Sequence, residues 1–247
     1  MQVERVLERL TSYQDVEQAI DDVVTEAFFA APFLTWLRDG RYHSYQLRHF
    51  AIQYSYYSRH FPRVLGAAIS AMEPLDTWWV PLADNLWDEA GRGRPGHSHE
   101  QLYKTFLLSV DPDVALDERG IPQEPMSAVV KRAIDTFIDF FRDASPLAAM
   151  AAVGLGSEMF AGRVMQAIGE GFSHPVYNRD RKIDVRFWEI HADEHEPRHY
   201  QLCRDILVQY QEPEELREMF QVGREIALSE AKMYQGLHEE MLALKQA

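Results

Sequence analysis

Cysteine and long apolar runs are scarce in this sequence of 247 residues. Its one cysteine, Cys203, cannot form an internal disulfide, which fits a reducing compartment. We find no run approaching the roughly 18 uncharged apolar residues that a membrane span needs. The first residues, 1–5, are acidic and amphipathic rather than basic and then apolar, so we expect no signal peptide. These observations predict a cytoplasmic protein without a membrane partner.

Positive charge is also in short supply. The sequence has 25 lysines and arginines against 39 aspartates and glutamates, a formal net charge of −14. Nucleic acids and anionic membranes both require a dense cationic face, so we expect neither as a partner. Most of the surplus carboxylates are expected to be solvated helix surface, and the acidity therefore does not identify a cationic substrate.

Alternating apolar and polar residues, the pattern of half-buried strands, are rare, whereas apolar residues recur at three- and four-residue intervals. Pro32, Pro74 and Pro125 fit helix starts, and Asp39-Gly40 fits a helix end. With 46% apolar residues and no repeat or linker, the chain is predicted to form one all-α domain over residues 1–247. The predicted helices are 2–10, 13–29, 32–38, 44–71, 74–90, 98–109, 125–143, 145–170, 179–210 and 213–245.

The segment 187–199 holds three of the ten histidines, His191, His195 and His199. Their four-residue spacing places them within about 80° of one another on one helical face. Imidazoles on a core-facing helix are costly unless they are protonated, hydrogen-bonded or bound to metal. Histidines interleaved with carboxylates such as Glu196, without a thiolate, form a ligand set suited to iron, manganese or zinc.

The alternative for this segment is a polar stripe on the surface, solvated by water. The flanking apolar residues Phe187, Trp188, Leu202 and Ile206 favour an inward orientation. Pro197, placed inside a helix, is expected to produce a kink or bulge, and bulges are frequent at functional sites.

A metal site in a helical bundle needs carboxylates from facing helices. Glu158 is the strongest candidate because it is the only charged residue in the apolar stretch 151–160. Glu89 follows, with an ordinary acidic helix end as its alternative. His97 and His99 come just after a glycine-rich loop, and either could reach back to Glu89.

In order and spacing these segments resemble the haem-oxygenase-like diiron oxidases. Residues 85–89, the Gly/Pro loop and residues 99–106 are similar to the first metal motif of that family. Glu158 matches the second motif and residues 191–199 the third. Residues 33–40 and 54–65 are similar to the two preceding helices, so the resemblance spans about residues 28–207.

The family includes the chlamydial death-domain-associating protein, 4-aminobenzoate synthases, and oxidases of fatty acids, amino acids and guanidines. The resemblance implies a haem-oxygenase-like bundle that binds two ferrous ions, with manganese as a possible substitute, and uses O2 as co-substrate. Of the two histidines after the loop, only His99 keeps the family's spacing. The implied ligands are Glu89, His99, Glu158, His191 and His199.

The sixth ligand is left open by a difference in spacing. The family pattern is His-x3-Asp-x2-His, whereas this sequence has His191-x3-His195-x3-His199. A regular helix puts His195 in the place of the aspartate. A one-residue bulge near Pro197 instead makes Glu196 the ligand, and we prefer the bulge because it retains three carboxylates and three neutral imidazoles.

The substrate is expected to be a small external molecule. The tyrosine and lysine that 4-aminobenzoate synthases are thought to consume correspond to Leu34 and Ile168, which cannot do that chemistry. An external electron donor and a homodimer are further expectations. The candidate substrate-binding residues are Tyr54 and Tyr57, with core packing as their alternative, and Arg163, with a structural ion pair as its alternative.

The same fold hosts other functions. A thiaminase II would need a reactive thiol, and Cys203 is the only candidate. A haem oxygenase would need a proximal histidine, for which His43, His49 and His60 are available. An oxidase similar to pyrroloquinoline-quinone synthase would bind no metal. A non-enzymatic interaction protein would have solvent-exposed histidines.

Overall fold

The computed structural model describes residues 3–192 and 196–245, without the side chain of Glu196. Within these residues the chain is helical and contains no strand; Leu116 and Pro122 form an isolated β-bridge. The all-α prediction is confirmed. The α-helices are α1 (Val3–Leu7), α2 (Tyr13–Val24), α3 (Pro32–Arg38), α4 (Ser44–Ser70), α5 (Asp76–Glu89), α6 (His99–Val110), α7 (Ala128–Phe140), α8 (Pro146–Val153), α9 (Met159–Phe172), α10 (Arg186–Ile190), α11 (Glu196–Leu207) and α12 (Pro213–Ala243).

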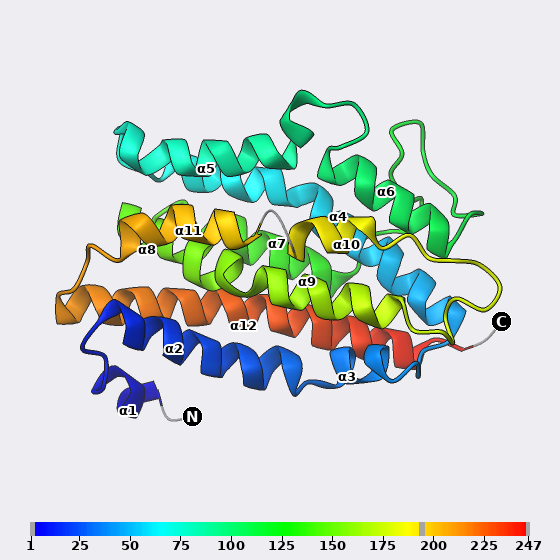
Figure 1. Cartoon of the computed structure of the whole chain (residues 1–247), viewed down its shortest axis with the longest axis horizontal. Helices are drawn as coiled ribbons and strands as arrows, with labels where there is room; N and C mark the ends of the chain where they lie inside the picture. The colour runs from blue at the N-terminus through cyan, green and yellow to red at the C-terminus, as the bar shows by residue number, and fades with distance from the viewer. Residues whose placement is uncertain (1–2, 193–195, 246–247) are drawn as a thin grey trace.

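Two long helices organise the bundle. The 31-residue helix α12 runs along one side of the molecule and packs against α2, α7 and α8 (Figure 1). Helix α4 packs against α5, α6 and α7. Helices α10 and α11 lie between α4 and α12 (Figure 1). Helix α11 packs against α5 and α9, and helix α10 packs against α6 and α9. The ends of α5, α6 and α10 therefore meet in the interior.

Side-chain caps fix where several of these helices begin. Ser12 and Asp15 form a reciprocal capping box at the start of α2, and Ser98 caps α6 by accepting a hydrogen bond from the Gln101 N–H. Ser127 and Ser145 do the same for α7 and α8. Because these hydroxyl groups satisfy N–H groups that have no partner within the helix, each start is set by the sequence itself.

The central helical segment Pro146–Phe172 joins α8, a π-helical turn η3 (Gly154–Glu158) and α9. Contrary to our expectation, this segment is long and apolar enough to pass as a membrane span, with a mean hydropathy of 1.2. In the structure 72% of its most apolar window is buried, as in the core helix of a globular protein. Its apolarity is explained by packing against the other helices.

The predicted helix 179–210 is wrong in its boundaries. The chain after Phe172 forms a loop, and the helical structure resumes as α10 at Arg186, where the Asp184 carboxylate accepts the Arg186 N–H. His191 and Ala192 are π-helical, and α11 begins at Glu196. Pro197 is the second residue of α11, where a missing N–H is tolerated. The kink or bulge predicted near it falls partly on residues 193–195, outside the described residues.

Helix α12 approaches η3 very closely at Gly156. A Cβ atom at this position would lie 2.7 Å from the Cβ of Ile226. Gly66, on the exposed face of α4, has no atom within 4 Å of the corresponding position. The two glycines therefore form a matched pair for testing this packing.

We predict that Gly156→Ala lowers the free energy of unfolding by about 1–3 kcal/mol, since the added methyl overpacks the α12 contact. Gly66→Ala is the control and is expected to raise stability by up to about 1 kcal/mol, the difference in helix propensity. Denaturant unfolding followed by circular dichroism measures both. Equal effects of the two substitutions would contradict the close approach of α12 to η3.

Candidate metal centre

The first element of the site is a tight loop that brings two helix ends together. Glu89 is the last residue of α5 and His99 is the first residue of α6. Between them Gly91 adopts a φ of 67°, and a Cβ there would lie 2.5 Å from the backbone of His97 and Ser98. Only glycine permits both the left-handed conformation and this approach. The loop therefore places the two side chains side by side.

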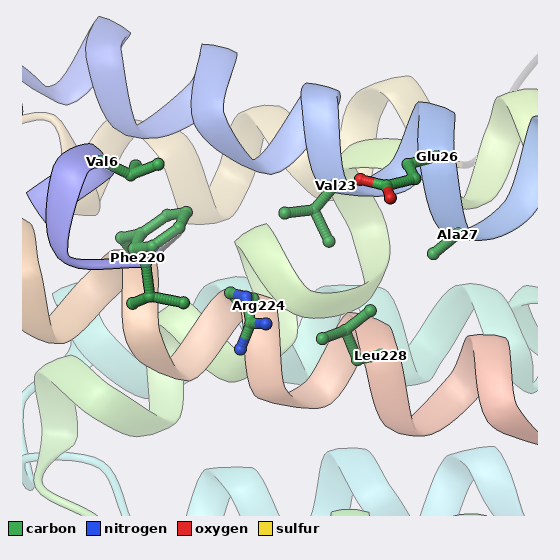
Figure 2. Close-up of a pocket in the computed structure, with 8 residues that line it drawn as sticks. Val6, Val23, Glu26, Ala27, Phe220, Arg224 and Leu228 are labelled. Carbon is green, nitrogen blue, oxygen red and sulfur yellow. The ribbon is translucent and has the colours of Figure 1, made fainter. Parts of the chain in front are cut away.

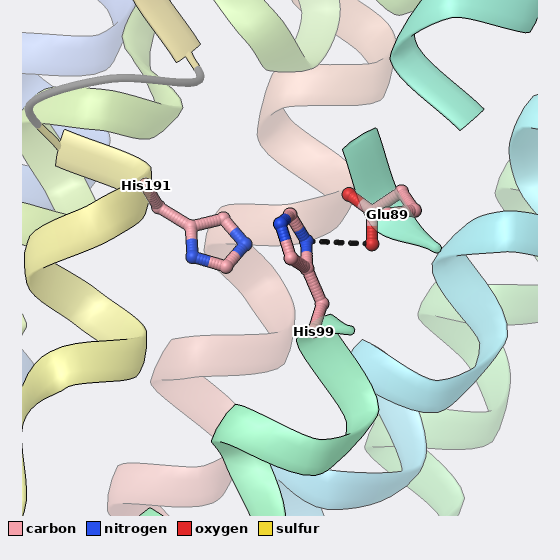
Figure 3. Close-up of side chains that lie close together, drawn as sticks. All are labelled: Glu89, His99 and His191. Carbon is pink, nitrogen blue, oxygen red and sulfur yellow. Dashed lines mark ion pairs between the residues drawn. The ribbon is translucent and has the colours of Figure 1, made fainter. Parts of the chain in front are cut away.

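Glu89, His99 and His191 form one buried cluster (Figure 3). The His99 Nδ1 lies 2.7 Å from the Glu89 Oε2, and the rings of His99 and His191 are centred 4.0 Å apart. One potential ligand atom from each residue lies within 4.8 Å of the other two. The three side chains are 7%, 2% and 4% exposed, so water does not account for their placement.

The orientation of His191 is set by its own helix. Its Nδ1 lies 2.5 Å from the Phe187 carbonyl oxygen one turn earlier, and it donates to that oxygen in the neutral tautomer. In this tautomer Nε2 is the ring nitrogen that carries no proton. A backbone carbonyl that fixes the tautomer in this way is typical of histidines that bind metal.

Glu158 and His199 form a second buried group beside the first. The His199 Nδ1 lies 3.7 Å from the Glu158 Oε2, and Asn85 donates a hydrogen bond of 2.7 Å to the Glu158 Oε1. Glu158 reaches this position from the end of the π-helical turn η3. Both side chains are about 1% exposed.

Asp88 is a residue that the sequence analysis missed. Its Oδ2 lies 3.0 Å from the His199 Nε2, on the opposite edge of the ring from Glu158. Burial alone would raise the pKa of Asp88, but hydrogen bonds from His199 and Arg92 hold that pKa at about 2. Arg198 also donates to Asp88, at 2.5 Å. The aspartate is thus an ionised acceptor that orients His199.

The electrostatics of the cluster favour a cation. Burial, with a further contribution from His199, lowers the pKa of His99 to about 3, so this imidazole is neutral. The neutral His99 imidazole cannot compensate the charge of Glu89, and burying an ionised carboxylate is costly without a positive charge. Buried carboxylates beside neutral imidazoles are the donor set that iron or manganese accepts. The residues present therefore fit an iron site.

The remaining predicted residues have different positions. His195 lies outside the described residues, as does the side chain of Glu196, so the sixth ligand stays a prediction. His97 is exposed, while His99 is buried, as the spacing predicts. Arg163 lies at the surface and forms an ion pair with Asp21, which is the structural alternative for this residue.

Beside the first cluster lies a small cavity, bounded by Glu89 and His191 on one side. Tyr54 and Tyr57, the candidate substrate-binding residues, line it. Glu230 of α12 also lines it and was missed by the sequence analysis. The four-residue spacing of Ile226, Glu230 and Tyr234 places them on one face of α12.

A larger cavity lies at the surface between α1, α2 and α12 (Figure 2). Its walls are mainly apolar, from residues such as Val6, Val23 and Phe220, with Glu26 and Arg224 as the charged members. It lacks a group of metal-binding side chains among its described residues. The buried cluster is therefore the better candidate for chemistry.

The sequence comparison agrees with this site. Residues 48–230, well over half of the chain, match the family of iron-containing redox enzymes. The chain belongs to this family. A comparison with curated proteins finds no match.

Solved structures establish the fold. The chain is similar to a CADD-like protein of unknown function from Nostoc punctiforme, with a TM-score of 0.72, 17% identity, and coverage of 96% of this chain and 99% of that one. It is similar to a TenA homologue from Pseudomonas syringae pv. tomato, with a TM-score of 0.68, 14% identity and coverage of 94% and 92%. It is also similar to a domain of unknown function with a haem-oxygenase-like fold from Shewanella denitrificans. The TM-score is 0.66 and the identity 13%, with coverage of 92% of this chain and 90% of that one. The predicted haem-oxygenase-like fold is confirmed.

The structure bears on two of the rival functions. Cys203 is 1% exposed and packs against Gly154. Burial raises the pKa of its thiol, and the negative charge of Glu158 raises that pKa further. This is an unreactive environment for a thiol. The histidines at 99, 191 and 199 are buried, in contrast to the exposed histidines expected of an interaction protein.

We predict that Asp88→Asn weakens ferrous binding about 10- to 100-fold, because the amide no longer supplies a charged acceptor for the His199 N–H. Anaerobic titration with ferrous iron measures the affinity. Asp84→Asn is the matched control, since Asp84 pairs with Arg92 and Arg198 but with no ligand histidine among its described contacts. If both substitutions weaken binding equally, the arginine network and not the histidine contact is responsible.

Proposed function

We propose that this protein is a non-haem diiron oxidase or oxygenase that uses O2 to oxidise a small external organic molecule. The observation that carries the proposal is the buried Glu89–His99–His191 cluster beside the Glu158–His199 pair. Membership of the iron-containing redox family supports it. The substrate classes we propose are amines, amino acids and fatty acids.

The two groups of buried side chains suggest which residues would bind each of the two ions. Glu89, His99 and His191 would hold one ion, and Glu158 and His199 the other, completed by His195 or Glu196. Two ferrous ions would supply the electrons that reduce O2, and manganese is accepted by the same ligand types. An oxygenase of this kind needs an external electron donor, which we include in the proposal.

The chain's own contribution is to orient the ligands and exclude water. Asp88 and the Phe187 carbonyl each hold one imidazole in a single tautomer. Phe187 packs against His99 and His191, with ring centroids 6.3 and 4.3 Å away, and Tyr103 packs against Phe187 in turn. A dry, shaped cavity protects the reaction from water and from side reactions.

We further propose a cytoplasmic homodimer. Large apolar side chains remain exposed along α5, including Trp79 at 37% and Trp87 at 50%. A second copy of the chain would cover such a surface. The alternative function, a metal-free or thiol-dependent enzyme of the same fold, is disfavoured by the burial of Cys203 and by the buried carboxylates.

We predict that wild-type protein binds two ferrous ions per chain and that Glu158→Ala retains at most one. Its oxygen consumption with substrate should fall to the level of protein without iron, since the second ion loses a carboxylate. Iron analysis after anaerobic reconstitution, with an oxygen electrode, measures both. Glu170→Ala, on the exposed face of α9, is the control. Two irons per chain and oxygen-dependent turnover in Glu158→Ala would refute the proposal.

We predict that Cys203→Ala retains the iron content and the oxygen-dependent turnover of the wild type. The thiol is buried against Gly154, so its loss should cost only about 1 kcal/mol of stability, as for other small truncations in a core. Thermal unfolding, iron analysis and turnover are measured on the same preparation. Loss of turnover with iron content intact would favour the thiol-dependent alternative.

A further inference from the structure

The cavity beside the candidate metal centre has an unusual combination of walls. Its aromatic walls are formed by Tyr54, Tyr57, Phe61 and Phe187. None of the described residues that line it is a lysine or an arginine. A substrate carboxylate would therefore find no cationic side chain among these walls.

Of the two described acidic residues that line this cavity, Glu89 is a candidate metal ligand and Glu230 is not. Glu230 comes from α12, lines the same cavity as Glu89 and His191, and is 7% exposed. Burial, followed by the charge of Glu158, raises the pKa of Glu230 to about 8, against the opposing effect of the Tyr57 and Tyr234 hydroxyl groups. At neutral pH this group is therefore mostly protonated, and a cation bound against it would favour its ionised form.

A carboxylate flanked by aromatic faces is the chemistry that recognises an ammonium group. The carboxylate neutralises the charge in a dry cavity, and tyrosine rings attract a cation through their π-faces. Tyr54 and Tyr57 adjoin each other, with ring centroids 5.6 Å apart, and both line the cavity with Glu230. These three side chains thus line the same cavity as Glu89 and His191.

We propose that Glu230, Tyr54 and Tyr57 bind the ammonium group of an amine substrate. This inference rests on the proposed oxidase function and narrows its substrate class to amines. With the nitrogen held at Glu230, the adjoining carbon atoms lie in the same cavity as Glu89 and His191. Glu230 acts as a substrate-binding residue and not as a metal ligand.

The volume of the cavity limits the size of the chemical group that can enter it. Its volume is about 30 Å3, enough for about two water-sized groups. It is therefore matched to an amine head and the carbon attached to it. Ser58 and Phe61 are only partly buried, so the rest of a slender substrate would extend past them along α4.

The test compares n-butylammonium with butyrate and 1-butanol, which have similar chains and different heads. Isothermal titration calorimetry is performed on full-length protein, first without metal and then after ferrous reconstitution. We expect wild-type protein to bind butylammonium at least tenfold more tightly than butyrate. Glu230→Gln should weaken butylammonium about 10- to 100-fold, the usual effect of removing a charged hydrogen-bond partner, and should retain the wild-type iron content.

Two controls separate recognition from folding. Glu225→Gln removes an exposed carboxylate from the same helix and should leave butylammonium binding unchanged. Tyr57→Phe keeps the aromatic face and should weaken binding by less than Glu230→Gln does. Thermal unfolding confirms that each variant is folded.

The inference is overturned if butyrate binds as tightly as butylammonium, or if Glu230→Gln binds butylammonium like the wild type. It is also overturned if Glu230→Gln loses iron, because Glu230 is then a metal ligand. A wild-type protein that discriminates the amine but binds no iron would refute the oxidase proposal instead. The two failures are thus distinguished by separate measurements.

Discussion

The structure depends on keeping several carboxylates close together in an apolar interior. Asp88, Glu89, Glu158 and Glu230 are each less than a tenth exposed. Arg92 and Arg198 compensate Asp88, whereas Glu89 and Glu158 are faced by imidazoles. Ionised carboxylates are costly to bury unless a positive charge is present. A bound cation would satisfy that requirement at Glu89 and Glu158, and an ammonium group bound beside Glu230 would favour the ionised form of that residue.

The bundle supplies these carboxylates from irregular points in its helices. Glu89 and His99 stand at helix ends joined by the glycine loop, and Glu158 ends a π-helical turn. His191 lies in a second π-helical stretch, between α10 and α11. A regular helix fixes successive side chains at 100° intervals, so convergence on one point requires such departures. The regular helices α4 and α12 provide the rigid frame around them.

The regular parts of this fold were predictable from sequence, and the irregular parts were not. Helix periodicity and prolines predicted α3 and α12 almost to the residue, because each of these helices begins at a proline. Glu158 was predictable because a lone charge in an apolar stretch needs a partner. The break between α10 and α11 was not, because histidine spacing alone fits one continuous helix.

Glu230 escaped prediction for a different reason. Helix α12 contains many glutamates, and only the packing of its inner face separates this one from the solvated ones.

The two sides of the metal cluster serve different purposes. On the α5–α11 side, Arg198 links Asp84 and Asp88, and Asp88 in turn contacts His199. This clamp joins two helices through charged groups and holds a ligand histidine at their junction. On the α4–α12 side the walls are aromatic and end at Glu230. In the proposed function, a small molecule would enter this cavity, whose described walls include neither Arg198 nor Asp88, so its entry would leave the clamp in place.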